Sequence, residues 1–125
     1  TFFGGDTYPL YAKFTSVSGL RAGNPVKMLG MEIGRVESLR IDQEDLKAVV
    51  EFRINNGIKV YDDAIASIKT EGLIGDCYLS IDPGGGGSVL AAGGSIIETQ
   101  PAVEISDIIG KYAFGDVQNN AKPSE

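Results

Sequence analysis

The sequence contains no histidine and only one cysteine, Cys77. Histidine is the usual general base and the commonest zinc ligand, so its absence removes most catalytic and zinc-binding arrangements. One cysteine cannot form an internal disulfide, and in a strand-like stretch it is typical of a small buried residue. No apolar run reaches the roughly 20 residues of a transmembrane helix. With no carboxylate pair at an acid–base spacing either, we expect no enzyme, no cofactor and no metal site.

The chain is acidic, with 17 Asp and Glu against 11 Lys and Arg and a formal net charge of −6. The positive residues are spread along the chain without a basic run. Phosphate backbones would repel such a protein, so we expect no nucleic acid partner. At 125 residues the chain is long enough for one domain with a single core.

Period-two alternation of apolar residues dominates the first hundred positions. Residues 8–14 and 50–54 show it most clearly, residues 64–69 and 77–81 repeat it, and residues 95–99 close the series. Glycine, proline and asparagine punctuate the stretches between them. Short strands at even spacing with such turns favour a small all-β barrel or sandwich.

Two polar connections suggest binding sites at first sight. Residues 42–45 read Asp-Gln-Glu-Asp, but four polar residues between strands are typical of a solvated hairpin turn rather than a metal site. Residues 84–87 are four glycines, followed by Ser88 and Val89. A nucleotide-binding P-loop needs lysine and then serine or threonine after its glycines. We therefore interpret residues 84–87 as a flexible loop that leads to another strand.

An apolar turn lies between residues 64–69 and 77–81. Gly72 and Gly75 permit the backbone angles of a tight, protruding turn, and Leu73 and Ile74 place two bulky apolar side chains at its tip. Such a tip needs an apolar partner. That partner is the domain's own core, other copies of the chain or an apolar ligand.

The periodicity changes to that of a helix in residues 103–115. Four apolar residues there stand at i, i+3, i+4 and i+7, and Gly115 is a suitable stop. This stripe consists of Ile105, Ile108, Ile109 and Tyr112. It must pack either on its own barrel or in a bundle of such helices from several chains. Residues 116–125 have the composition of a flexible tail.

Several motifs in fixed order carry a family resemblance. Residues 19–36 read GLRAGNPVKMLGMEIGRV, residues 70–81 read TEGLIGDCYLSI, and Pro83-Gly84 follows. Over residues 8–99 the chain resembles the MCE (mammalian cell entry) domain of bacterial lipid transporters. Residues 103–115 resemble the C-terminal helix of the D subunits of Mla (maintenance of lipid asymmetry) phospholipid transporters.

The resemblance implies a seven-stranded β-barrel over residues 8–99, followed by a C-terminal helix. It also implies that residues 1–7 are the remnant of a linker from an N-terminal transmembrane anchor that this sequence lacks. The protein would then sit on the periplasmic face of the bacterial inner membrane as a homohexameric ring. Its implied partners are phospholipid, an inner-membrane permease, a cytoplasmic ATPase and a periplasmic lipid carrier protein.

The resemblance also assigns roles to the candidate site residues. In the family the matching turn points toward the ring axis. Leu73 and Ile74 would therefore line a hydrophobic pore, with Gly72 and Gly75 as the hinges of the pore loop. The apolar stripe of residues 103–115 would extend the channel or form contacts between subunits.

Three classes of function therefore compete. The first is a lipid conduit in a membrane transporter, and the second is a β-barrel interaction or adhesion module whose apolar turn is buried. The third is a small hydrolase that uses carboxylates alone. Solution mass distinguishes the first two, because a conduit needs a ring, and co-purified phospholipid is a second test. Turnover of a substrate would be needed for the third.

Overall fold

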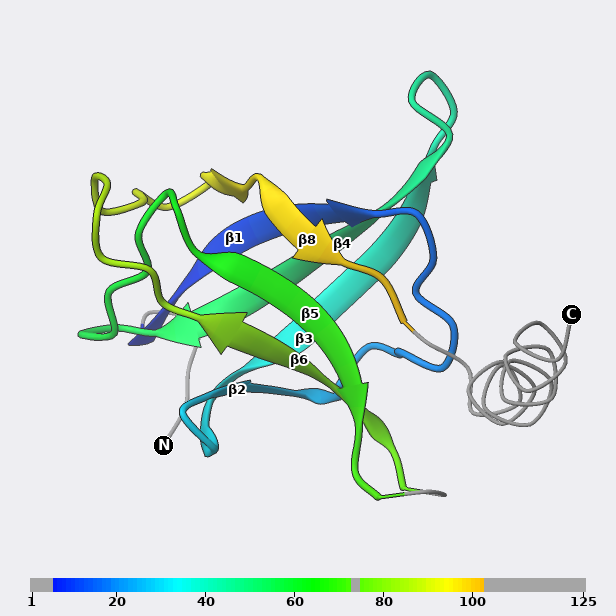
Figure 1. Cartoon of the computed structure of the whole chain (residues 1–125), viewed down its shortest axis with the longest axis horizontal. Helices are drawn as coiled ribbons and strands as arrows, with labels where there is room; N and C mark the ends of the chain where they lie inside the picture. Colours follow the sequence, from blue (N-terminus) through cyan, green and yellow to red (C-terminus); the bar gives the residue numbers. More distant parts are fainter. Residues whose placement is uncertain (1–5, 73–74, 103–125) are drawn as a thin grey trace, which may run out of the picture.

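Alternating apolar residues form eight β-strands in the computed structural model, which describes residues 6–72 and 75–102. The strands are β1 (Thr7–Phe14), β2 (Pro25–Met28), β3 (Met31–Asp42), β4 (Lys47–Asn55), β5 (Ile65–Thr70), β6 (Cys77–Asp82), β7 (Ser95–Ile96) and β8 (Glu98–Gln100). They belong to one sheet in the order β7-β1-β4-β3-β2-β6-β5-β8, which curls so that β5 and β6 lie in front of β3 and β4 (Figure 1). The all-β prediction is confirmed for the described residues, and the helix predicted over residues 103–115 lies outside them. In the part of the chain that the structure describes, no helix has the length and apolarity needed to cross a bilayer.

The two ends of this strand order are neighbouring pieces of one short segment, which nearly closes the barrel. β7 pairs in parallel with β1, and β8 pairs in parallel with β5. The Thr99 hydroxyl of β8 also donates to the Lys13 carbonyl of β1 at 2.7 Å. Only Ile97, which is 76% exposed, separates β7 from β8. The structure thus has eight strands where seven were predicted, because a bend at Ile97 divides the last one, and the predicted barrel is confirmed.

Buried side chains from paired strands meet inside the barrel. Leu10 of β1 lies opposite Phe52 of β4, and Val26 of β2 lies beside Leu79 of β6. All four side chains are fully buried. Burial of each such side chain contributes roughly 1.5–3 kcal/mol relative to exposure. The predicted alternation in residues 8–14 and 50–54 is therefore what places these strands around the core.

Cys77 packs at the rim of the core rather than inside it. Its side chain is only half-buried, and its Sγ lies 3.9 Å from the Ser18 carbonyl oxygen. A Cβ added to Gly19 would come within 2.8 Å of this sulfur. The structure therefore corrects the prediction of a buried thiol: Cys77 fills the space between the start of β6 and the loop before β2.

Two long connections run side by side at the end of the barrel where β5 begins and β6 ends. These are residues 56–64 and 83–94. The amide of Leu90 donates to the Val60 carbonyl and the amide of Asp62 donates to the Ser88 carbonyl, each at 2.8 Å. Val60 is fully buried in the core. Since this end holds the base of the β5–β6 hairpin, the turn of that hairpin lies at the opposite end of the barrel (Figure 1).

Candidate functional site

The β5–β6 hairpin extends beyond the strands that flank it. β8 pairs with β5 only over residues 65–67, and β2 pairs with β6 only at Leu79 and Ser80. Among the described residues, the distal arms, residues 68–70 and 77–78, therefore form ladder pairs only with each other. Figure 1 shows the hairpin projecting away from the barrel at this point. The turn therefore projects from the sheet at the end of these two arms.

The base of this turn is closed by a hydrogen bond and by two glycines with different roles. The amide of Glu71 donates to the Asp76 carbonyl at 3.0 Å. Gly72 has a φ of +69°, a left-handed conformation that favours glycine. At Gly75 a Cβ would lie only 1.9 Å from the Glu71 carbonyl oxygen, so only glycine fits there. Both glycines are exposed at the positions where the sequence predicted a protruding turn.

The remaining predicted site residues lie outside the described part of the chain. They are Leu73 and Ile74 of the turn, and Ile105, Ile108, Ile109 and Tyr112 of the predicted helix. Their assignment to a pore lining, a channel or a subunit contact stays a prediction.

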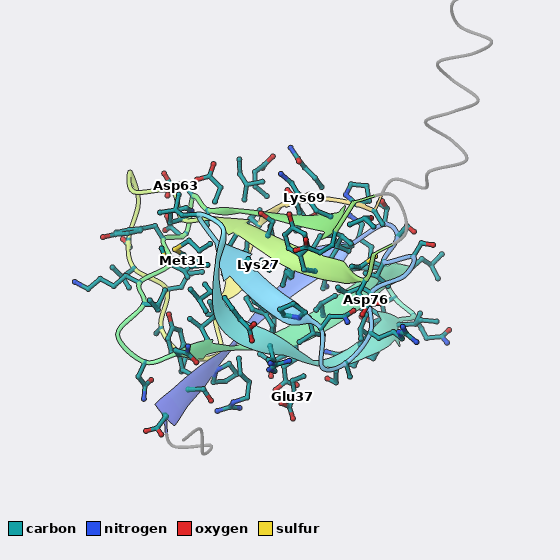
Figure 2. The ribbon with its side chains drawn as sticks, turned by 90° about the horizontal axis from the view of Figure 1, so that it is seen from below. Lys27, Met31, Glu37, Asp63, Lys69 and Asp76 are labelled. Atoms are coloured by element: carbon teal, nitrogen blue, oxygen red, sulfur yellow. The ribbon has the colours of Figure 1, made fainter. Side chains whose placement is uncertain are left out.

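Charged side chains from β2 and the preceding loop flank the turn, and sequence reasoning missed them. The Lys27 ammonium of β2 forms an ion pair with the Glu71 carboxylate and lies 4.7 Å from the centroid of the Tyr78 ring. The hydrogen bond from Lys27 to Glu71 raises the pKa of the lysine above its ordinary value. At the other side of the turn, Arg21 lies 3.8 Å from Asp76. Figure 2 shows Lys27 in the middle of this face and Asp76 nearer the turn.

The acidic connection between β3 and β4 is a hairpin turn, as its polar composition predicted, and it also binds a lysine, which was not predicted. Lys13 of β1 contacts the carboxylates of Asp42 at 3.0 Å and Asp45 at 2.5 Å. The hydrogen bond from Lys13, together with amides of the turn, lowers the pKa of Asp42. Across residues 6–72 and 75–102, no group of three His, Cys, Asp or Glu side chains is placed to hold a metal ion.

The glycine-rich loop differs from the free, flexible connection that was predicted. The Asp63 carboxylate accepts hydrogen bonds from the amides of Gly85 at 3.0 Å and Gly86 at 2.9 Å. These bonds lower the pKa of Asp63. Asp62 similarly accepts from the Ser88 amide at 3.2 Å. Amides that would face a phosphate in a nucleotide loop are thus used by the protein's own carboxylates, and the loop clamps the base of the β5–β6 hairpin.

An open, mostly apolar pocket of ≈ 320 Å³ lies at the end of the barrel opposite the turn. It lies where β1 begins, and the Tyr8 hydroxyl donates to the Ile58 carbonyl at 2.5 Å. Its lining is Tyr8, Gly57, Ile58, Lys59, Val89, Leu90 and Ala92. None of these residues belongs to the predicted lipid-contacting set, so this pocket is separate from the candidate pore loop.

These features define a class of protein: a small β-barrel domain that presents one glycine-flanked hairpin turn beyond its sheet. The family model described as "MlaD protein" matches residues 6–84. The chain therefore belongs to the MlaD family, and the predicted family resemblance is confirmed.

Relatives and a solved structure agree with this assignment. The chain is 33% identical over 124 residues to the intermembrane phospholipid transport system binding protein MlaD of Escherichia coli K12, covering 94% of this chain and 68% of that protein. It is 30% identical over 118 residues to the protein of the same name from Haemophilus influenzae, covering 91% of this chain and 71% of the relative. A chain of the Acinetobacter MlaFEDB complex in an ATP-bound conformation superposes with a TM-score of 0.78 at 26% identity. That match covers 86% of this chain and 81% of the other.

Proposed function

We propose that this protein is the lipid-conduit subunit of a phospholipid transport system and works as a homohexameric ring. Membership of the MlaD family supports a role in phospholipid transport, because its relatives are named as binding proteins of intermembrane phospholipid transport systems. The likeness to a chain of the MlaFEDB complex supports association with permease and ATPase subunits. In this proposal the ring sits on the periplasmic face of the inner membrane, anchored by a preceding transmembrane helix, and exchanges lipid with a periplasmic carrier protein.

The observation that carries the proposal is the β5–β6 hairpin. Its distal arms lie outside the ladders of the barrel, and Gly72 and Gly75 at its turn are exposed. This arrangement favours a projecting turn over one buried in the barrel's own core. Leu73 and Ile74 from each subunit then line a central pore.

An apolar lining matches the physical requirement of lipid transfer. Each CH₂ group of an acyl chain exposed to water costs about 0.8 kcal/mol, so a tail needs an unbroken apolar path. A ring of leucine and isoleucine provides such a path without specific hydrogen bonds, and therefore accepts tails of different length. In the same proposal Ile105, Ile108, Ile109 and Tyr112 extend the channel or join the subunits. No covalent step is required, and directional movement comes from the partner ATPase.

The test combines assembly with transfer. Sedimentation of the protein at physiological salt should give the mass of a hexamer, and solvent extraction should recover phospholipid. The double variant Leu73→Asn, Ile74→Asn should keep the melting temperature of the wild type, since it changes no strand residue. In the reconstituted transporter it should lose phospholipid transfer. A monomer without lipid, or a double variant with full transfer, would contradict the proposal.

A further inference from the structure

Lys27 on β2 has a side chain that reaches across β6 to the hairpin turn. It lies on β2 beside Ser80 of β6, and its ammonium bridges the Tyr78 ring and the Glu71 carboxylate. Its side chain is only 24% exposed although it is charged. Glu32, which faces Lys27 on β3, is bound instead by Arg35 at 2.9 Å. The ammonium is therefore directed toward the turn rather than toward its neighbour on β3.

Glu71 is the residue on which the geometry of the turn depends. Its amide closes the turn through the Asp76 carbonyl, and its carbonyl oxygen is packed against Gly75. Its side chain is held by Lys27. A displacement of Glu71 would consequently change both the closing hydrogen bond and the contact with Gly75. The ion pair is thus a link between the barrel wall and the projecting turn.

We propose that Lys27 is a positioning residue for lipid transfer: through Glu71 and Tyr78 it fixes the direction in which the β5–β6 turn leaves the barrel. The inference rests on the proposed function for its link to lipid, but the positioning itself is a property of one protomer. Beyond the ladders with β2 and β8, the two arms of the hairpin have no strand neighbour except each other to orient them in the part of the chain that the structure describes. Lys27 supplies that constraint from β2.

Arg21 provides the matched control. It also pairs with a residue at the base of the turn, but its distance to Asp76 is 3.8 Å, and both side chains are more than three-quarters exposed. Pairs of this kind contribute little, because water and salt screen them and both side chains stay mobile. Lys27 has the shorter contact, the lower exposure and the aromatic ring beneath it. Removal of the two charges should therefore have different effects.

The experiment measures amide hydrogen exchange resolved to single residues in the full chain. Lys27→Met should speed exchange of the Glu71 amide about five- to tenfold, because the turn opens more often. Lys27→Arg should stay within about twofold of wild type, since a guanidinium can pair with the carboxylate and stack on the ring. Arg21→Met should leave the Glu71 amide unchanged. The core amides of Val50 and Phe52 should be unchanged in every variant.

Lipid transfer by the reconstituted transporter is the second measurement. Lys27→Met should lower the transfer rate by a similar factor, and Lys27→Glu combined with Glu71→Lys should restore much of it. If the Glu71 amide of Lys27→Met exchanges at the wild-type rate, or if the core amides accelerate with it, Lys27 is not a positioning residue.

The same measurements separate this inference from the proposed function. Full transfer by Lys27→Met, in a system that Leu73→Asn, Ile74→Asn inactivates, contradicts the role of Lys27 alone. Full transfer by both variants contradicts the proposed conduit instead.

Discussion

Replacement of the two turn glycines by alanine, one at a time, should have unequal effects, because the structure needs them for different reasons. At Gly72, with φ +69°, an added Cβ would meet no atom within 4 Å. The cost is therefore only that of a left-handed backbone, about 1–2 kcal/mol. If this strain lowered the free energy of unfolding of the whole domain, the melting temperature would fall by roughly 4–8 °C. Local opening of the turn can only reduce that fall.

At Gly75 the cost is steric. A Cβ there would lie 1.9 Å from the Glu71 carbonyl oxygen and 2.7 Å from its Cβ, and real Cβ contacts essentially never fall below 3.0 Å. The main chain at Glu71 has to move, which breaks its bond to Asp76, worth about 1 kcal/mol net. Because the turn lies outside the barrel ladders, we expect the core to remain folded. Gly75→Ala should then keep a melting temperature close to that of Gly72→Ala while it loses most lipid transfer.

The assay compares thermal unfolding with phospholipid transfer for both variants in the reconstituted transporter. Gly72→Ala should keep at least half of the wild-type rate, and Gly75→Ala should fall roughly tenfold or more, the size expected when about 1.4 kcal/mol of positioning is lost. Equal transfer by the two variants would refute the argument that contact between Gly75 and Glu71 sets the turn. A collapse of the melting temperature in Gly75→Ala would show that the turn belongs to the core.

Three further outcomes follow from the fold. Phe52→Ala should destabilise the barrel by about 3–5 kcal/mol in urea unfolding, whereas Ile97→Ala, at an exposed bend, should change the free energy of unfolding by less than about 0.5 kcal/mol. Asp63→Asn should destabilise the protein at neutral pH, and its difference from wild type should vanish in acid. The amides of Gly85 and Gly86 lower the folded pKa of Asp63, so its contribution is complete above the ordinary carboxyl value near 3.8 and is lost as the pH falls through the lower folded value. Unfolding curves between about pH 2 and pH 7 check the sign. Removal of residues 103–125, after the Ala102 amide that donates to Ser16, should leave the melting temperature within a few degrees while sedimentation shows a weaker ring.

The sequence predicted those parts of the fold that depend on the residues of a single strand or turn. In residues 8–14 and 50–54, alternation alone specifies which side chains face inward, and β1 and β4 follow it. The sequence also predicted the protruding turn at Gly72 and Gly75, because the backbone freedom of glycine is a property of the residue itself. The polar turn at residues 42–45 is likewise local, and its acids are solvated or bound to Lys13.

Contacts that depend on the order of strands in the sheet could not be predicted from the sequence. Lys27 and Glu71 are 44 positions apart and meet only because β2 lies beside β6. Glycine has no side chain, so nothing in the sequence indicates that the amides of Gly85 and Gly86 donate to Asp63. The bend at Ile97 that splits the last strand is equally hidden, because it arises from two different partners, β1 and β5.

That bend has a consequence for how the protein folds. β1 is the first of the described strands to leave the ribosome, but its second neighbour, β7, is among the last described residues to be made, and the same segment supplies the outer neighbour of β5. A nascent chain that ends before Ser95 therefore has two open sheet edges at once. Pairing across so much sequence is slow, and open edges invite association with other chains. The five residues of β7 and β8 thus cover both edges in one late step, and a chain stalled just before Ser95 is the form most exposed to aggregation.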